Sequence, residues 1–186
     1  NIACRMVGGT SIMQIITQPF INAGAVFMAE KIKLDSVDRQ ILHDLQDHGR
    51  MTNVDLAKNA GISAPPCLRR VRALEDAGII KSYHADIDSD ALGFSVQVFA
   101  FVGLTSQAEI DLQDFETLVS TWPEVRECHM LMGETDFLLK IVAHDWDDFQ
   151  KFLTSYLTPA KNVSHVKTAL SIRSAKQLDG VPINQA

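Results

Sequence analysis

Residues 52–74 read TNVDLAKNAGISAPPCLRRVRAL, and this stretch decides the fold of the first half of the chain. Its first part has apolar residues at helical spacing after two candidate N-cap residues, Thr52 and Asn53. Gly61 supplies the positive φ that ends such a helix, and Ser63 offers a cap for the next one. The two prolines that follow fall in the first turn of the second helix, where a missing N–H costs little. Two short helices joined by a tight turn predict a helix-turn-helix over about 53–72.

The second helix of this pair has a predicted buried stripe of Leu68, Val71 and Leu74 and carries three arginines. In a helix-turn-helix the second helix enters the DNA major groove, where guanidinium groups bind phosphates and guanine edges. Arg72 could instead pair with Asp76 one helical turn away, as on an ordinary solvated helix face. The cap, the turn and the extended chain that follows favour DNA binding. The predicted DNA-binding residues are Ser63, Ala64, Pro65, Arg69, Arg70 and Arg72.

The residues on either side complete a predicted domain of three helices. Upstream, apolar residues recur at helical spacing after Asp35 and Ser36, the two candidate N-caps, and Gly49 ends the run. Downstream, the helix ends before Gly78 and the chain becomes extended, which predicts the wing strand of a winged helix-turn-helix. Residues 34–95 are therefore the predicted DNA-binding domain together with its linking strand.

The second half of the chain predicts a different architecture. Its hydrophobic pattern predicts strand 94–104, helix 110–122, strand 125–132, strand 137–143, helix 146–157 and strand 163–172. The order βαββαβ is typical of a ferredoxin-like sandwich, in which two helices cover one face of an antiparallel sheet. Residues 96–175 are predicted to form this domain, and residues 176–186 a tail.

One turn in this second domain has a chemistry of its own. The turn Gly133-Glu134-Thr135-Asp136 joins two predicted strands. Its glycine can expose backbone amides to a carboxylate, and Asp136 can accept hydrogen bonds from an ammonium group, so the turn could hold both ends of a free amino acid. The alternative is an ordinary hairpin turn in which Asp136 bonds its own backbone.

Composition and charge limit the possible functions. The 186 residues are 46% hydrophobic and 22% charged, which excludes a disordered or fibrous chain. The net charge of −6 argues against DNA binding, but residues 31–85 hold 9 Lys and Arg against 7 Asp and Glu, whereas residues 86–186 hold 7 against 15. This asymmetry indicates two modules with different partners. Three cysteines without a CxxC spacing favour a reducing cytoplasm.

The first 27 residues do not share the pattern of the rest. Their apolar run is too short and too polar to span a bilayer. A single cation, Arg5, and the small residues at 23–25 leave a poor signal peptide as an alternative. Met28 is the expected natural start, so residues 1–27 are expected to be a non-native or disordered extension.

The order of these motifs closely resembles the Lrp/AsnC family, the leucine-responsive and feast/famine transcription regulators. The resemblance runs continuously from about 34 to 175. It is carried by LDSVDRQIL (34–42), DHGR (47–50), CLRRVRALE (67–75), VRECH (125–129) and GETDFLLK (133–140).

The resemblance implies an α+β protein in which an N-terminal winged helix-turn-helix is joined to a C-terminal βαββαβ, ferredoxin-like domain of the ACT-like type called RAM. It implies a bacterial, cytoplasmic, nucleoid-associated regulator of transcription that binds double-stranded DNA. Such proteins form homodimers through their C-terminal sheets and assemble further into tetramers, octamers or larger oligomers. Several weakly basic heads on one DNA would then supply affinity by multivalency. A small effector, usually a free amino acid, binds between subunits near the turn, which implies the effector-binding residues Gly133, Glu134, Thr135 and Asp136.

An enzyme and a nucleoid-architectural protein are the two alternative classes of function. An enzyme is not expected, because the sequence lacks GxGxxG, GxxxxGK[ST], GxSxG and HExxH, and its six histidines include no pair at i, i+4. Cys128 and His129 are adjacent on a predicted strand and point to opposite faces, so no metal site is expected. Neither a cofactor nor a membrane partner is expected. The remaining alternative is a nucleoid-architectural protein that binds DNA without an effector response.

Overall fold

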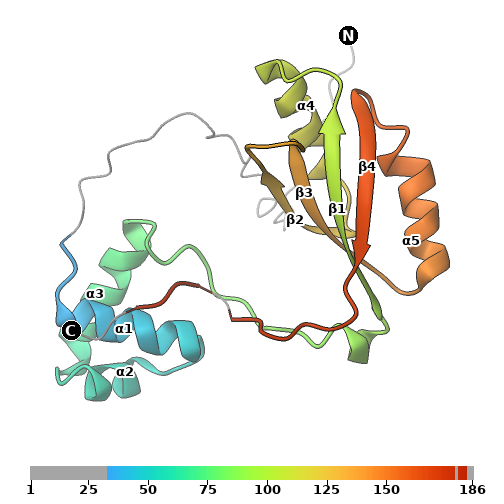
Figure 1. Ribbon diagram of the computed structural model, residues 1–186. Coiled ribbons are helices and arrows are strands. Elements are labelled where there is room, and N and C mark those ends of the chain that lie inside the picture. Colours follow the sequence, from blue (N-terminus) through green and yellow to red (C-terminus); the bar gives the residue numbers. More distant parts are fainter. Residues whose placement is uncertain (1–32, 179, 184–186) are drawn as a thin grey trace, which may run out of the picture.

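The computed structural model describes residues 33–178 and 180–183, and the extension predicted for 1–27 lies outside the described residues. Figure 1 labels the helices and strands. They are α1 (Ser36–Asp47), α2 (Asn53–Asn59), α3 (Ala64–Asp76), the 3₁₀ turn η1 (Asp90–Leu92), β1 (Val96–Leu104), α4 (Glu109–Val119), β2 (Val125–Met130), β3 (Phe137–Ala143), α5 (Trp146–Phe152), the π turn η2 (Leu153–Leu157) and β4 (Val163–Leu170).

Helices α1, α2 and α3 form a separate small domain, here called the head (residues 34–80). Asp35 caps α1 through a capping box with Asp38, and Thr52 caps α2, as local sequence predicts. Ile41 and Cys67 are fully buried at the centre of its core. Leu68, expected in the buried stripe, is 39% exposed, because the preceding residue Cys67 takes the inward position.

Residues 81–90, where the wing and the linking strand are expected, form no strand within the described residues. Residues 81–90 are exposed throughout and pair with no other strand of the described residues. A strand needs partners for its backbone N–H and C=O groups, and the three helices of the head offer none. The segment is therefore an extended linker, which ends at η1 and at Gly93, where φ is 83°.

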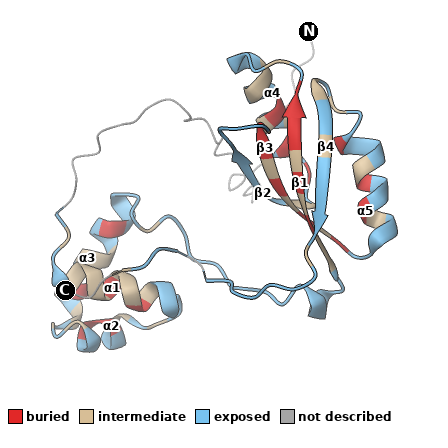
Figure 2. Ribbon diagram, in the orientation of Figure 1, coloured by how far each residue is buried: buried red, intermediate tan, exposed pale blue. Residues whose placement is uncertain are grey.

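The second domain has the predicted βαββαβ order. Its four strands form one sheet in the order β2-β3-β1-β4, and every neighbouring pair is antiparallel. Alternate residues of β1 and β3 are buried against α4 and α5, so both helices lie on the same face of the sheet. Figure 2 shows the buried residues gathered between the sheet and these helices. The largest fully buried side chains of this core are Phe115, Phe137 and Phe149.

The opposite face of the sheet is covered by neither α4 nor α5. We call it the open sheet face and define it by Phe99, Phe101, Leu138, Lys140 and Val142. Phe101 lies opposite Leu138, and Phe99 lies opposite Lys140. These side chains are half-buried in the single chain. Two phenylalanines and two aliphatic residues on an uncovered face indicate a surface that pairs with something else.

Candidate DNA-reading and effector sites

Helix α3 presents one face to the core of the head and the other to solvent. Cys67 and Leu74 hold it against α1 and α2. Pro65, Arg69 and Arg72 are exposed, and their spacing of four and three residues places them on one outward face. This exposed face is where a helix-turn-helix contacts DNA.

The polar groups at this face are available for a ligand. Neither Arg69 nor Arg72 takes part in an ion pair within the described part of the chain, so the alternative pairing of Arg72 with Asp76 is not formed. The hydroxyl of Ser63 makes no capping hydrogen bond to α3. Ala64 is half-buried, and its carbonyl accepts a hydrogen bond of 2.9 Å from Nδ2 of Asn53, which ties the start of α3 to α2.

Arg70 is half-buried and, unlike Arg69 and Arg72, is paired within the head, so its predicted contact with DNA stays a prediction. Its Nη1 donates to Oδ2 of Asp35 at 2.8 Å and to Oδ1 of Asp38 at 2.7 Å. These hydrogen bonds raise the pKa of Arg70. The pKa of Asp35 is lowered, first by the backbone N–H of Asp38 that it caps and further by Arg70. Arg70 thus holds α3 against the start of α1. It directly follows Arg69, and adjacent residues of a helix point in different directions, so Arg70 can point to α1 while Arg69 points outward.

The predicted effector turn lies on the surface between β2 and β3. Leu131 donates its N–H to the carbonyl of Asp136 at 2.8 Å and so closes the loop. Gly133 has open space on the side where a Cβ would project, Glu134 is exposed and Thr135 is half-buried. The backbone of this turn is therefore accessible to a small molecule.

Asp136 has a different position from the other three residues of the turn. Only 9% of it is exposed, and both carboxylate oxygens are already hydrogen-bonded. Oδ2 accepts the backbone N–H of Leu104 at 2.7 Å, and Oδ1 accepts Nε2 of Gln107 at 2.8 Å. The hairpin alternative, in which Asp136 bonds its own loop backbone, is not what forms. Asp136 instead connects the turn to the end of β1 and to the approach of α4.

Two features at this turn were missed by sequence reasoning. Gln107 lies 29 residues before Asp136, and no local motif marks it. The second feature is a run of apolar side chains at the entrance of the loop, in which Met130, Leu131 and Met132 are 56%, 37% and 104% exposed. Consecutive exposed apolar residues are a sequence-readable signal for an interaction surface, since a loop in solvent has no need of them.

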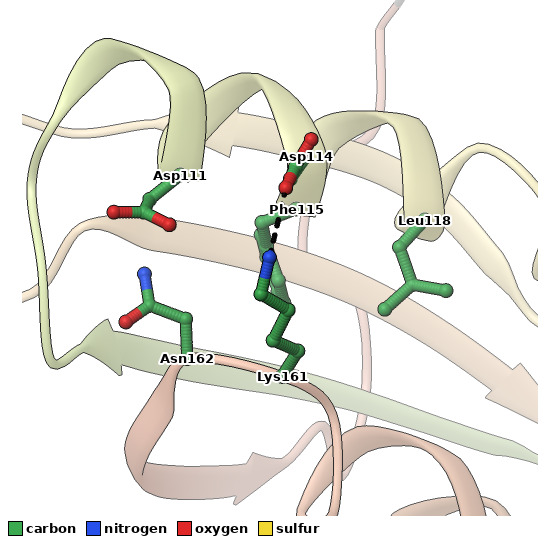
Figure 3. Close-up of a pocket in the computed structure, with 6 residues that line it drawn as sticks. All are labelled: Asp111, Asp114, Phe115, Leu118, Lys161 and Asn162. Atoms are coloured by element: carbon green, nitrogen blue, oxygen red, sulfur yellow. Dashed lines mark hydrogen bonds and ion pairs between the residues drawn. The ribbon is translucent and has the colours of Figure 1, made fainter.

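A shallow hollow of about 270 Å³ lies between α4 and the start of β4 (Figure 3). Phe115 and Leu118 contribute to its lining, and Lys161 pairs with Asp114 across it at 3.2 Å. Asn162 holds the neighbouring turn by donating from Nδ2 to the carbonyl of Ser106 at 3.0 Å. The ammonium group of Lys161, which lines this hollow, is therefore already paired with the carboxylate of Asp114.

Metal and membrane chemistry find no support in the described residues. No group of three or more His, Cys, Asp or Glu side chains in residues 33–178 and 180–183 could hold a metal ion. Although Cys128 is exposed as a residue, partial desolvation of its thiol, with Glu116 nearby, raises its pKa to about 11. His129 lies 3.2 Å from a carboxylate oxygen of Glu127. Within the same described residues, no helix is long and apolar enough to cross a membrane.

Comparison with family models assigns both halves of the chain. Residues 34–81 match a winged helix-turn-helix DNA-binding model. Residues 97–181 match a model described as the Lrp/AsnC ligand binding domain. The two matches cover the head and the sheet domain in the order in which the structure has them.

Known proteins with both domains are similar over their whole length. A leucine-responsive regulatory protein of Rhizobium meliloti is 47% identical over 156 residues, which are 84% of this chain and all of that protein. A transcriptional regulator of Neisseria meningitidis, solved in complex with L-Met, is 36% identical with a TM-score of 0.77, over 81% of this chain and 97% of that one. An AsnC family regulator from Agrobacterium tumefaciens is 30% identical with a TM-score of 0.75, over 80% and 97%.

Proposed function

Since this chain belongs to the Lrp/AsnC family of DNA-binding transcriptional regulators, we propose that a free amino acid, bound at the turn Gly133–Asp136, modulates its binding to an operator. The observation that carries the proposal is the division of polar groups between the two domains. Arginines without ion-pair partners lie on the outward face of α3, and an accessible turn beside a carboxylate lies in the other domain. One domain suits an anionic duplex, and the other suits a small zwitterion.

The DNA contact is made by the outward face of α3. Arg69 and Arg72 reach phosphates and guanine edges, while Ser63, Ala64 and Pro65 lie at the start of the helix beside the DNA backbone. Arg70 contributes indirectly, because it holds α3 against α1. With two arginines at the interface, a single head binds DNA weakly, which agrees with the net charge of −6 of the chain.

The effector binds with its two charged ends on different parts of the turn. Its carboxylate lies against the backbone near Gly133 and the hydroxyl of Thr135, with Glu134 beside them. Its ammonium group replaces the Gln107 amide at Oδ1 of Asp136, since that amide belongs to a side chain and can leave, whereas the Leu104 N–H is fixed in the backbone. The complex of the Neisseria regulator with L-Met supports an amino acid as the effector class.

Affinity for DNA comes from assembly. We propose that two chains pair through the open sheet face into a homodimer, and that the run Met130–Met132 joins dimers into tetramers, octamers or larger forms. Linked heads then bind one DNA together, so that modest single-head affinity becomes strong binding. The regulator acts in the cytoplasm, associated with the nucleoid, and carries no catalytic activity or cofactor of its own.

Fluorescence anisotropy on the DNA upstream of its own gene, against scrambled DNA at fixed salt, tests this function. The measurement is repeated with each common amino acid. Preferential binding that one amino acid shifts supports an effector-gated regulator. Equal binding to both DNAs without any response would support the nucleoid-architectural alternative.

Two matched variants separate the sites. Arg72→Ala should weaken DNA binding by about 1–3 kcal/mol and lower the salt dependence by about one phosphate contact. Asp136→Asn should blunt the effector response and leave DNA binding without effector nearly intact. Equal loss of both properties in both variants would contradict the division of labour.

A further inference from the structure

The C-terminal tail returns to the head and contacts the end of α1. Val181 donates its N–H to Oε1 of Gln46 at 3.0 Å, and its carbonyl accepts Nε2 of the same side chain at 2.9 Å. One side-chain amide therefore pairs with both backbone groups of a residue 135 positions away. Neighbouring strands of a sheet exchange hydrogen bonds in the same reciprocal way.

The residue before this pairing is shaped for it. Gly180 has a φ of 78°, a conformation that residues with a Cβ rarely adopt. A Cβ at this position would also overlap the side chain of Gln46. Both the backbone conformation and the space beside Gln46 therefore favour glycine at position 180, next to Val181. Ile183 is half-buried, unlike the exposed stretch of tail before Gly180.

Among the described residues, the tail is the second of two connections between the domains. The head and the sheet domain have separate hydrophobic cores. The first connection is the linker 81–90, which is exposed along its whole length. The tail leaves β4 where Ser171 donates to the carbonyl of Gln97, and it stays exposed from Ile172 to Leu178 until it reaches α1 (Figure 1). A domain on one exposed linker reorients freely, whereas a domain held at two points does not.

We propose that residues 180–183 act as a strap that docks on Gln46 and restrains the orientation of the head relative to the sheet domain. Two hydrogen bonds from an exposed side chain favour the docked state by about ten-fold, so the strap can also be released. The tail that carries the strap leaves the sheet at the end of β4, the strand whose partner β1 carries Phe99 and Phe101 of the open sheet face.

Amide hydrogen exchange of the full chain, resolved at Val181 by fragmentation of the C-terminal peptide, tests the docking. In the wild type the Val181 amide should exchange about ten-fold more slowly than in a free peptide. Gln46→Ala and Gly180→Ala should each restore the free-peptide rate, the first by removing the hydrogen bonds and the second by overlap. Leu178→Ala is the matched control. The Leu178 side chain is 78% exposed and has no polar atom, so the Val181 amide of this variant should exchange as in the wild type. Gln46 and Gly180 are both exposed, so neither change threatens the folded cores.

Small-angle X-ray scattering of the same proteins tests the restraint. The distribution of distances should broaden in Gln46→Ala and Gly180→Ala and match the wild type in Leu178→Ala. A wild-type Val181 amide that exchanges at the free-peptide rate would overturn the proposal. So would variants that lose protection while their scattering curves superimpose on the wild type, because the contact would then restrain nothing. Neither readout requires DNA or an effector, so a failure of the proposed regulation would be recognised separately.

Discussion

At the scale of single residues, Arg70 and Asp136 each connect elements within their own domain. Arg70 joins α3 to the acidic start of α1, and Asp136 joins the turn before β3 to the end of β1 and to Gln107. Sequence patterns place both among ligand-binding residues, because an arginine on a reading helix and an aspartate after a glycine have the right chemistry. The pattern cannot tell that Asp35 and Gln107 lie within reach, since these partners are 35 and 29 residues away.

The stability of the head should depend on Arg70 and on pH. Arg70→Ala should lower the urea midpoint of the head slightly, because the ion pairs are partly exposed. The pKa of Asp35 is lowered in the folded head, so its stabilising effect is complete above the ordinary value of 3.8 and is lost as the pH falls through the lowered pKa. Urea titrations followed by circular dichroism between pH 7 and about pH 2 measure both effects.

Arg72→Ala is the control for this prediction. Arg72 is exposed and makes no ion pair in the described residues, so its removal should leave the urea midpoint unchanged while weakening DNA binding. An Arg70→Ala protein that keeps the acid sensitivity of the wild type in full would contradict the assigned pairing.

Gln107→Ala should bind the effector about 3- to 10-fold more tightly than the wild type. The reason is that the Gln107 amide and the effector ammonium group use the same oxygen of Asp136 in the proposed complex. Calorimetric titration with the responsive amino acid measures the change. Gln113→Ala is the matched control, because the side-chain amide of Gln113 donates to Glu109 on the exposed side of α4 and not to Asp136. Weaker binding in Gln107→Ala would show that Gln107 supports the site instead of occupying it.

At the scale of elements, local signals specify most boundaries. α1 and α2 begin at the caps that Asp35 and Thr52 supply, and the order of β1 to β4 follows the alternation of apolar residues. The absence of a strand at residues 81–90 was not predictable from those residues, because a strand forms only where a neighbour offers an edge. Cys67 and Leu68 show a second limit of prediction from sequence. Both are apolar and adjacent on α3, and only the packing against α1 and α2 determines that Cys67 is the buried one.

The turn between α2 and α3 should depend on Gly61. Its φ of 68° is in the left-handed region, and no atom lies near the place of a Cβ. Gly61→Ala should therefore cost about 1 kcal/mol of stability through backbone strain alone, and Gly61→Asn should cost less. Gly49→Ala is the control, because this glycine has ordinary backbone angles and room for a methyl group. Urea unfolding of the three variants would contradict the prediction if the Gly61 and Gly49 changes cost the same.

At the scale of the whole molecule, two cores and one uncovered sheet face define the organisation. The domain order and the βαββαβ topology could be predicted, because each depends on patterns within about 80 residues. The docking of residues 180–183 on α1 could not, since nothing near Gly180 or Gln46 signals a contact across the chain. Contacts between domains depend on how folded units meet, and no local pattern encodes that.

Phe101→Asp should weaken self-association through the open sheet face about 30-fold, equivalent to about 2 kcal/mol. Phe101 lies opposite Leu138, so a carboxylate there would be buried in any paired face. DNA affinity should fall with it by about 100-fold, because the heads lose their linkage. Analytical ultracentrifugation and anisotropy measure the two losses.

Ile110→Asp is the control for this change. Ile110 is 65% exposed on α4, which lies on the other face of the sheet. The oligomeric state and DNA affinity of the Ile110→Asp protein should therefore match those of the wild type. A Phe101→Asp protein that sediments as the wild type does would place the dimer contact elsewhere.

Because Cys67 of α3 is buried in the core of the head, its reactivity reports local unfolding of the head. Its thiol has no exposed surface, and burial raises its pKa, whereas Cys128 is exposed on the edge strand β2. A thiol reagent can react with Cys67 only after α3 has moved away from α1 and α2. The alkylation rate at Cys67, in a chain with Cys4 and Cys128 replaced by serine, therefore measures how often α3 separates from α1 and α2. DNA bound by that helix should slow the reaction, and the ratio of the two rates would give the free energy by which the operator stabilises the head.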